Sequence, residues 1–330
     1  MRENTKKLGT GLGLVTSIAT LAIGLVLQAA PADAGSSGGS HVTARWQGAL
    51  DTRSVAAVNA AYWTQYANQQ SLPTGWLGGN LLGCLPGLSS ASSNAATLSA
   101  LNYVRSLAGL APVTLSPSLS AGAQSAALIM SANGALNHNP TSAWKCYTPA
   151  GAAAASRSNL ALSYPAITSG QIIDLYMDDP GSNNFAVGHR RWVLNPFTTQ
   201  VGTGSTDTAN ALTVIGPTSS ARPNPRWVGW PTAGYFPNAI EPDGRWSLSS
   251  GRRNVSFARA KVRVYSGSTA IPVHQYRVEN GYAQPTLVWQ MPDGFSKSGA
   301  YRVVVTNIKK KGAKRPLRTA YTVSLFTPSP

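Results

Sequence analysis

Two histidines with polar neighbours are the side chains of this sequence best suited to do chemistry. His189 precedes Arg190 and Arg191, and His138 follows a predicted helix. A neutral imidazole nitrogen accepts a proton near neutral pH or binds a metal ion, and residues at the edges of regular elements are open to ligands. These residues suggest a binding cleft or a histidine-based reaction. The plainer alternative is a buried structural histidine, with the two arginines in ion pairs.

The segment around His189 is predicted to be a loop that leads into a short strand. Val187, Trp192 and Leu194 are the apolar positions of that strand, and Pro196 ends it. A second strand is expected to open near Gln200.

Upstream, apolar residues recur at intervals of three or four, which is typical of helices. The expected helices are residues 51–70, 92–108, 116–133 and 169–177. Ser92 or Ser93 is expected to cap the second helix, and Pro117 fits the first position of the third. With a strand at 211–215, the pattern predicts an α+β fold, in which helices pack against a small sheet.

The C-terminal part changes to a period of two, which is typical of strands. The expected strands are residues 262–265, 272–273, 286–289, 301–305 and 321–325. Short strands at this spacing predict a small all-β, immunoglobulin-like sandwich. A proline-rich linker over residues 218–237 is expected to precede it.

The first 34 residues have the pattern of a signal peptide. Arg2, Lys6 and Lys7 precede an apolar run over residues 12–27, and Ala32-Asp33-Ala34 offers a small-x-small cleavage site. A retained membrane anchor is the alternative. We expect a secreted protein, extracellular or associated with the cell wall, with a flexible, low-complexity leader after the cleavage site.

The positive charge is concentrated in the C-terminal part. Residues 222–330 hold 17 Lys and Arg against 4 Asp and Glu, whereas the whole 330-residue chain has a net charge of +16. This field favours anionic partners, such as a cell-envelope polymer or lipid head groups. An extracellular address and the lack of a strong nucleic-acid motif argue against nucleic acid. The densest cluster is Lys309, Lys310, Lys311, Lys314 and Arg315, in a predicted hairpin that either binds anions or only solubilises the turn.

The chain has two cysteines, Cys84 and Cys146. In an exported protein a small, even number of cysteines indicates a disulfide, and two buried free thiols are the alternative.

Several short stretches follow one another in a characteristic order. They are Leu-Asn-Tyr-Val-Arg at 101–105, Ala-Gly-Leu-Ala-Pro-Val at 108–113, Ala-Gln-Ser-Ala-Ala at 123–127, Gly-His-Arg at 188–190, Val-Leu-Asn-Pro at 193–196 and Val-Gly-Thr-Gly at 201–204. In this order they resemble the CAP superfamily (cysteine-rich secretory proteins, antigen 5 and plant pathogenesis-related proteins) in its bacterial, secreted form. The resemblance covers residues 92–216.

This resemblance implies an αβα sandwich with a cleft in which two histidines face two acidic residues around a divalent metal. The histidines carry over to His138 and His189. Ser158 stands at the first acidic position, and the second falls near Asp178. With so few ligands, a zinc or magnesium ion on the two histidines would bind weakly. Asn159 and Arg190 are the further cleft residues that the resemblance implies.

The expected domains are a signal peptide (1–34), a leader and covering segment (35–90), the CAP-like domain (91–217), the linker (218–237) and a basic β-sandwich (238–330). Three functions remain open. The first is a monomer that binds a small apolar or lipid-like ligand in the His-lined cleft, with its basic domain on an anionic envelope surface. The second is a histidine- or metal-dependent extracellular hydrolase, and the third is a wall adhesive with a vestigial cleft. We favour the first and leave catalytic residues unassigned.

Overall fold

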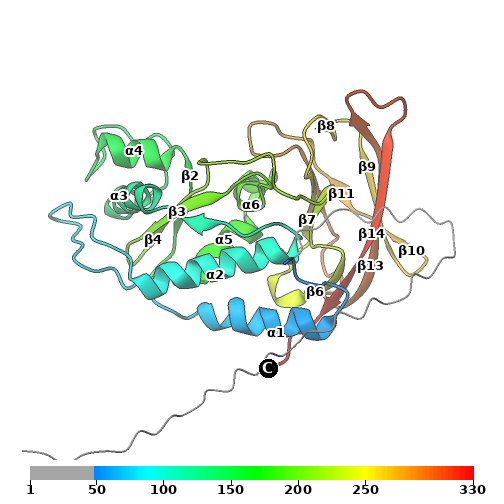
Figure 1. Ribbon diagram of the computed structural model, residues 1–330, viewed down its shortest axis with the longest axis horizontal. Helices are drawn as coiled ribbons and strands as arrows, with labels where there is room; N and C mark the ends of the chain where they lie inside the picture. The colour runs from blue at the N-terminus through cyan, green and yellow to red at the C-terminus, as the bar shows by residue number, and fades with distance from the viewer. Residues whose placement is uncertain (1–47) are drawn as a thin grey trace, which may run out of the picture. The chain divides into compact units, whose positions relative to one another are not determined.

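The computed structural model describes residues 48–330 (Figure 1). The expected signal peptide and the first part of the leader lie outside these residues. Within them, no helix is both long and apolar enough to cross a membrane.

The N-terminal half contains the helices and one sheet. The helices are α1 (Val55–Gln65), η1 (Ala67–Gln69), α2 (Ala91–Leu107), α3 (Pro117–Asn133), α4 (Pro149–Ala155), α5 (Gln171–Asp178), η2 (Ser182–Asn184) and α6 (Gly188–Val193). The strands are β1 (Thr114–Leu115), β2 (Ser158–Leu162), β3 (Gln200–Ser205) and β4 (Ala209–Thr213). They form a sheet of order β1-β3-β4-β2, in which only the β1–β3 pair is parallel.

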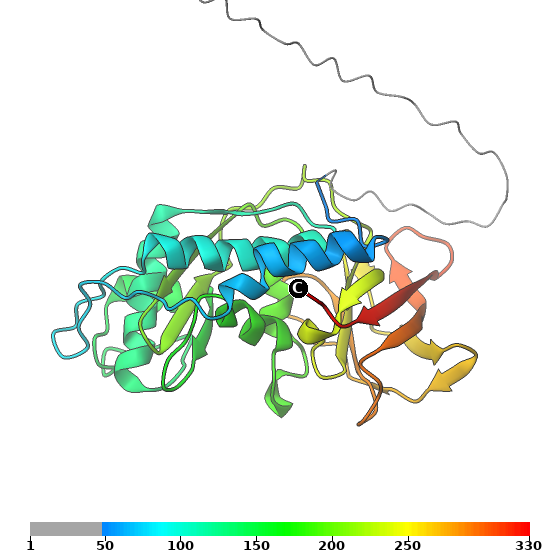
Figure 2. The same ribbon diagram turned by 90° about the horizontal axis from the view of Figure 1, so that it is seen from below.

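Helices cover both faces of this sheet (Figures 1 and 2). α3 and α4 pack on one face, where Ala211 of β4 belongs to a core of small residues. α2 and α5 pack on the other face, where the next residue, Leu212, belongs to the larger core. Alternation along the strand explains this division, because successive side chains point to opposite faces. α1 lies against α2.

The helix ends follow the chemistry of their capping residues. Ser116 caps α3 by accepting a hydrogen bond from the Leu119 amide, and Pro117 occupies the first turn. Gly134 ends α3 in the left-handed region, with φ 56°. These ends were predicted, whereas the cap of α2 is Ser90 and not Ser92 or Ser93.

The predicted strand around His189 is wrong. Residues 188–193 form α6, in which the Arg191 amide donates to the Val187 carbonyl (3.0 Å) and the Leu194 amide to the Arg190 carbonyl (2.9 Å). Val187 precedes this helix with φ 47°, a conformation that is costly for a β-branched residue. The expected strands near Gln200 and at 211–215 are present as β3 and β4.

The C-terminal part consists mainly of strands. These are β5 (Trp227–Trp230), β6 (Gly234–Pro237), β7 (Arg245–Ser250), β8 (Val255–Ser256), β9 (Lys261–Ser266), β10 (Thr269–Ile271), β11 (His274–Gln275), β12 (Thr286–Gln290), β13 (Gly299–Lys310) and β14 (Leu317–Phe326), with the short helix η3 (Asn238–Ile240) after β6. One sheet has the order β10-β9-β13-β14-β6, with β8 on β13, and the other has the order β11-β12-β7-β5.

Aromatic side chains fill the core of this part. Trp230, Trp246 and Trp289 are fully buried, and the Trp246 ring lies 5.7 Å from the Tyr301 ring, centroid to centroid. The segment predicted to be a linker carries β5 and β6 instead, and β6 pairs with β14 in parallel. The immunoglobulin-like arrangement and the domain boundaries stay predictions. Buried residues of both halves, including Leu101 and Trp246, belong to one apolar cluster.

Candidate functional site

A buried carboxylate fixes His189. Asp179 ends α5 in the left-handed region (φ 51°), and its side chain is fully buried. Asp179 Oδ2 accepts a hydrogen bond from the His189 backbone amide (2.9 Å), and Oδ1 lies 2.8 Å from His189 Nδ1. A carboxylate at Nδ1 favours the tautomer that carries its proton there, so Nε2 is left as the proton acceptor.

Asp178, the acidic residue expected at this place, has a different role. It is half-buried beside Asp174, and it is not one of the residues that line the pocket of His189. Burial raises the pKa of Asp178 to about 7, and the neighbouring Asp174 adds to the rise. The acidic partner of His189 is therefore one residue further along the chain than the sequence suggested.

Arg190 lies behind the site rather than in it. Its guanidinium is buried and donates to the carbonyls of Met177 (2.6 Å) and Arg245 (2.7 Å) and to Ser247 Oγ (3.3 Å). Desolvation lowers its pKa to about 10, so it stays cationic at neutral pH. Arg190 thereby joins the end of α5 to β7 in the C-terminal part.

His138 is exposed and lines the same pocket, and its Nδ1 lies 3.0 Å from the Ala155 carbonyl oxygen. Ser158 is buried, and its hydroxyl donates to the Ala154 carbonyl (2.7 Å). That bond holds the hydroxyl proton away from both imidazoles. The Asn159 side chain donates to the His189 carbonyl (3.1 Å) and so ties β2 to α6.

Both histidines line one pocket of about 310 Å³, called here the His pocket. Its polar lining residues include Asn159, Asn184 and Arg157, and its apolar lining residues include Trp192 and Ile215. None of the described residues that line it is acidic, because Asp179 lies behind His189. The His pocket therefore favours a ligand that accepts hydrogen bonds or carries negative charge.

Part of the pocket lining, Gly281 and Tyr282 from the C-terminal part, was not predicted from the sequence. Arg191 holds this segment by donating to the carbonyls of Glu279 (3.0 Å) and Gln284 (2.7 Å), and its guanidinium lies 5.1 Å from the centroid of the Tyr282 ring. A Cβ on Gly188 would lie 2.7 Å from the Tyr282 ring, so this approach requires glycine. Contacts between residues some ninety positions apart leave no local pattern that predicts them.

The donor set does not fit a metal site with three or four protein ligands. In residues 48–330, no three His, Cys, Asp or Glu side chains lie close enough together to hold an ion. Asp179 already occupies His189 Nδ1, and Ser158 carries no charge. Two imidazoles alone fall short of the ligand number that zinc requires.

The predicted disulfide is confirmed, since Cys84 and Cys146 are bonded. Both line a separate hollow of about 340 Å³ and are absent from the lining of the His pocket, so the bond lies outside that lining. The basic cluster is exposed: Lys309 and Lys310 end β13, and Lys311, Lys314 and Arg315 lie in the turn before β14.

A family model described as CAP: Cysteine-rich secretory protein family matches residues 98–215. No curated protein matches the chain. The matched stretch runs from α2 to just past β4 and includes both histidines and Asp179. The similarity to the CAP family therefore extends over residues 98–215.

Proposed function

We propose that the protein binds a small lipid-like ligand in the His pocket, with the ligand's polar head against the imidazoles and its apolar part against Trp192, Ile215 and Tyr282. The observation that carries the proposal is His189, oriented by buried Asp179 inside a pocket that is lined by both polar and apolar side chains. A volume of about 310 Å³ is at the small end of ligand sites. The pocket thus suits a compact amphiphile or the polar end of a longer one.

The charges around the pocket support an anionic head group. Arg157 lines the His pocket, and no described acidic side chain does. The Arg157 guanidinium can form a charged hydrogen bond with a carboxylate that enters the pocket, whereas an alcohol offers it only a neutral acceptor. A carboxylate should therefore bind better than an alcohol of the same chain length.

Calorimetric titration of the full chain with decanoate and with decanol tests this proposal. We expect decanoate to bind more tightly than decanol. His189→Gln should weaken decanoate binding about tenfold or more, because the hydrogen bond between the imidazole and the carboxylate is lost. His274→Gln is the matched control, since His274 is exposed on β11 and is not among the lining residues of the His pocket. Equal affinities of parent and His189→Gln would contradict the proposal.

The Asp179–His189 pair also supports a second function, hydrolysis of a small ester. Because Nδ1 is hydrogen-bonded to Asp179, Nε2 is the nitrogen that would take a proton from water as the water attacks the ester carbonyl. Water is the expected nucleophile because Ser158 donates its hydroxyl to Ala154. Release of p-nitrophenol from its acetate ester, compared between the parent and Asp179→Asn, is the measurement. A rate that Asp179→Asn leaves unchanged argues for binding alone.

We further propose that the exported protein docks on an anionic cell-envelope surface through its basic hairpin. Its five exposed cations have no acidic side chain beside them in the turn, and a disulfide is typical of an oxidising compartment. Retention on anionic wall polymer should fall steeply between low and physiological salt. Replacement of the five residues by Ser or Gln should abolish it, and unchanged retention would leave only a solubilising turn.

A further inference from the structure

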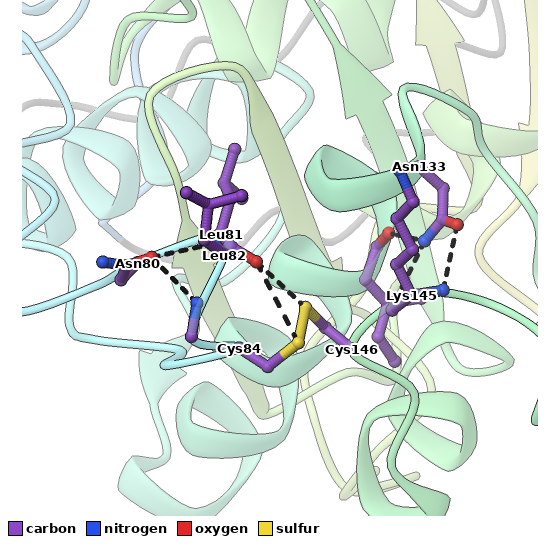
Figure 3. The surroundings of a disulfide bond; sticks show 9 residues. Asn80, Leu81, Leu82, Cys84, Asn133, Lys145 and Cys146 are labelled. Carbon is purple, nitrogen blue, oxygen red and sulfur yellow. Dashed lines mark hydrogen bonds between the residues drawn. A yellow bond between two sulfur atoms is a disulfide. The ribbon is translucent and has the colours of Figure 1, made fainter.

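Residues 76–88, called here the leucine arm, form a short two-stranded projection before α2. Backbone amides and carbonyls pair Leu77 with Leu88 (2.8 and 2.9 Å) and Asn80 with Leu85 (2.9 Å in both directions). The Cys84–Cys146 bond ties the tip to the segment that follows α3 (Figure 3). A Cβ on Gly87 would lie 2.5 Å from the Leu77 carbonyl oxygen, so the pairing needs glycine there. The backbone pairing and the disulfide therefore both hold the leucine arm in one conformation.

The side chains of the leucine arm are unusually exposed. Leu82 is 98% exposed, Leu88 68% and Leu77 60%. Half of the exposed large apolar residues in the described part of the chain belong to this arm, because Leu81 and Leu85 are exposed as well. Single exposed leucines are ordinary, but a contiguous group marks a surface that contacts an apolar partner.

Two backbone amides of the tip are satisfied by a side chain of the arm itself. Asn80 Oδ1 accepts hydrogen bonds from the amides of Leu82 (2.8 Å) and Gly83 (2.9 Å), as the dashed lines of Figure 3 show. Trp76 Nε1 donates to the Pro86 carbonyl (2.8 Å). Entry into lipid requires this satisfaction, since hydrocarbon offers no hydrogen bonds. The sequence also has no Asp, Glu, Lys or Arg between Arg53 and Arg105, so the arm carries no charge that must be desolvated.

The surroundings of the tip have the composition of a membrane interface. Trp144 and Tyr147 line the hollow of about 340 Å³ beside the disulfide, and Lys145 between them is exposed. Aromatic rings with a polar edge prefer the level of the lipid head groups, and a lysine there reaches their phosphates. We propose that the leucine arm inserts its tip into the outer layer of a phospholipid bilayer, with Trp144, Lys145 and Tyr147 among the head groups.

This contact is separate from the docking proposed for the basic hairpin. Attraction of the hairpin is electrostatic and is screened at about 1 M salt, where the Debye length is about 3 Å. Insertion of leucines is an apolar effect and persists at that salt concentration. Vesicles of phosphatidylcholine with phosphatidylglycerol at high salt therefore isolate the leucine arm.

The experiment is co-sedimentation of the full chain with these vesicles at about 1 M salt. Leu82→Asp should weaken binding about tenfold or more, because it places a charge at the most exposed position of the tip. Leu136→Asp, at a 47% exposed leucine outside the arm, is the matched control and should bind like the parent. Leu82→Asp should keep the parent's melting temperature, which shows that it is folded; if it does not, Leu88→Asp replaces it.

Three outcomes would overturn the proposal. One is vesicle binding by Leu82→Asp equal to that of the parent, and another is an equal loss in Leu136→Asp. The third is a parent that forms dimers without vesicles and that Leu82→Asp converts to monomers, with vesicle binding unchanged. This last result would assign the leucine arm to contacts between two copies of the chain.

Discussion

The two walls of the His pocket hold their histidines in different ways. On the α6 wall, the fully buried Asp179 side chain forms hydrogen bonds with both Nδ1 and the backbone amide of His189. On the other wall, His138 is exposed and its Nδ1 faces only the Ala155 carbonyl. A buried carboxylate sets the tautomer and the orientation of an imidazole, and a single contact with a carbonyl does so less firmly. The α6 wall is thus the one suited to acid–base work, and the His138 wall to an adaptable contact.

The difference extends to what stands behind each wall. Arg190 and Arg191 donate hydrogen bonds from α6 to carbonyls of the C-terminal part. In the other direction, Arg245 donates to the Asp179 carbonyl (3.0 Å). Behind His138, α3 and α4 meet through alanines such as Ala126 and Ala154. Small side chains allow close helix packing without buried charge. Buried cations therefore fix one wall, and apolar contacts fix the other.

The largest expected effect comes from Arg190→Ala. It removes a buried donor and leaves the carbonyls of Met177 and Arg245 without their partner, so unfolding free energy should fall by about 3–5 kcal/mol. The matched control is Arg157→Ala, in the lining of the His pocket, whose exposed guanidinium donates to the Ala153 carbonyl and should cost less than about 1 kcal/mol. Urea denaturation measures both. Equal losses would show that the two walls do not differ in this respect.

Much of the fold could be predicted from the sequence. Pro117 and Gly134 mark the ends of α3 because their backbone preferences act locally. The apolar pattern of residues 301–305 predicted β13, in which Tyr301 and Val303 are buried and Arg302 between them is exposed. Residues 187–194 were predicted wrongly because a helix of six residues is too short to show its period against three alternating apolar positions.

The site was only partly predictable for a related reason. The two histidines were found, and both line the His pocket, but the acidic partner was placed at Asp178 instead of Asp179. The left-handed turn at Asp179 decides which carboxylate faces α6, and periodicity does not locate such a turn to one residue. Tyr282 was missed because its approach depends on Arg191 and Gly188, which are distant in sequence.

A pH dependence of intermediate size should arise from two carboxylates of α5. Burial raises the pKa of Asp178 to about 7 and that of Asp174 to about 6, from an ordinary value of 3.8, although the Tyr66 hydroxyl lowers the latter. The folded state therefore keeps protons that the unfolded chain has already released above about pH 4. Stability should fall as pH rises from about 4 to about 7, and level off above that.

Asp178→Asn removes one of these ionisations. After allowance for solvent screening at this half-buried group, the variant should gain on the order of 1 kcal/mol at pH 8 relative to the parent and lose part of the slope. Thermal unfolding at pH 5 and pH 8 measures the effect. Asp207→Asn, at an exposed residue between β3 and β4, is the control and should leave the slope unchanged. A parent that gains stability between pH 5 and pH 7 would contradict the raised pKa values.

The smallest expected effect is that of His138→Ala on stability. The imidazole is exposed and faces one carbonyl, which stays accessible to water after the change, so the cost should be below about 0.5 kcal/mol. His189→Ala should cost about 2 kcal/mol, because it leaves Asp179 Oδ1 buried without its partner. The affinity for decanoate should nevertheless fall in both variants, since both imidazoles line the His pocket. Two equal losses of stability would remove the distinction between the walls, and unchanged binding in His138→Ala would confine the ligand to the α6 wall.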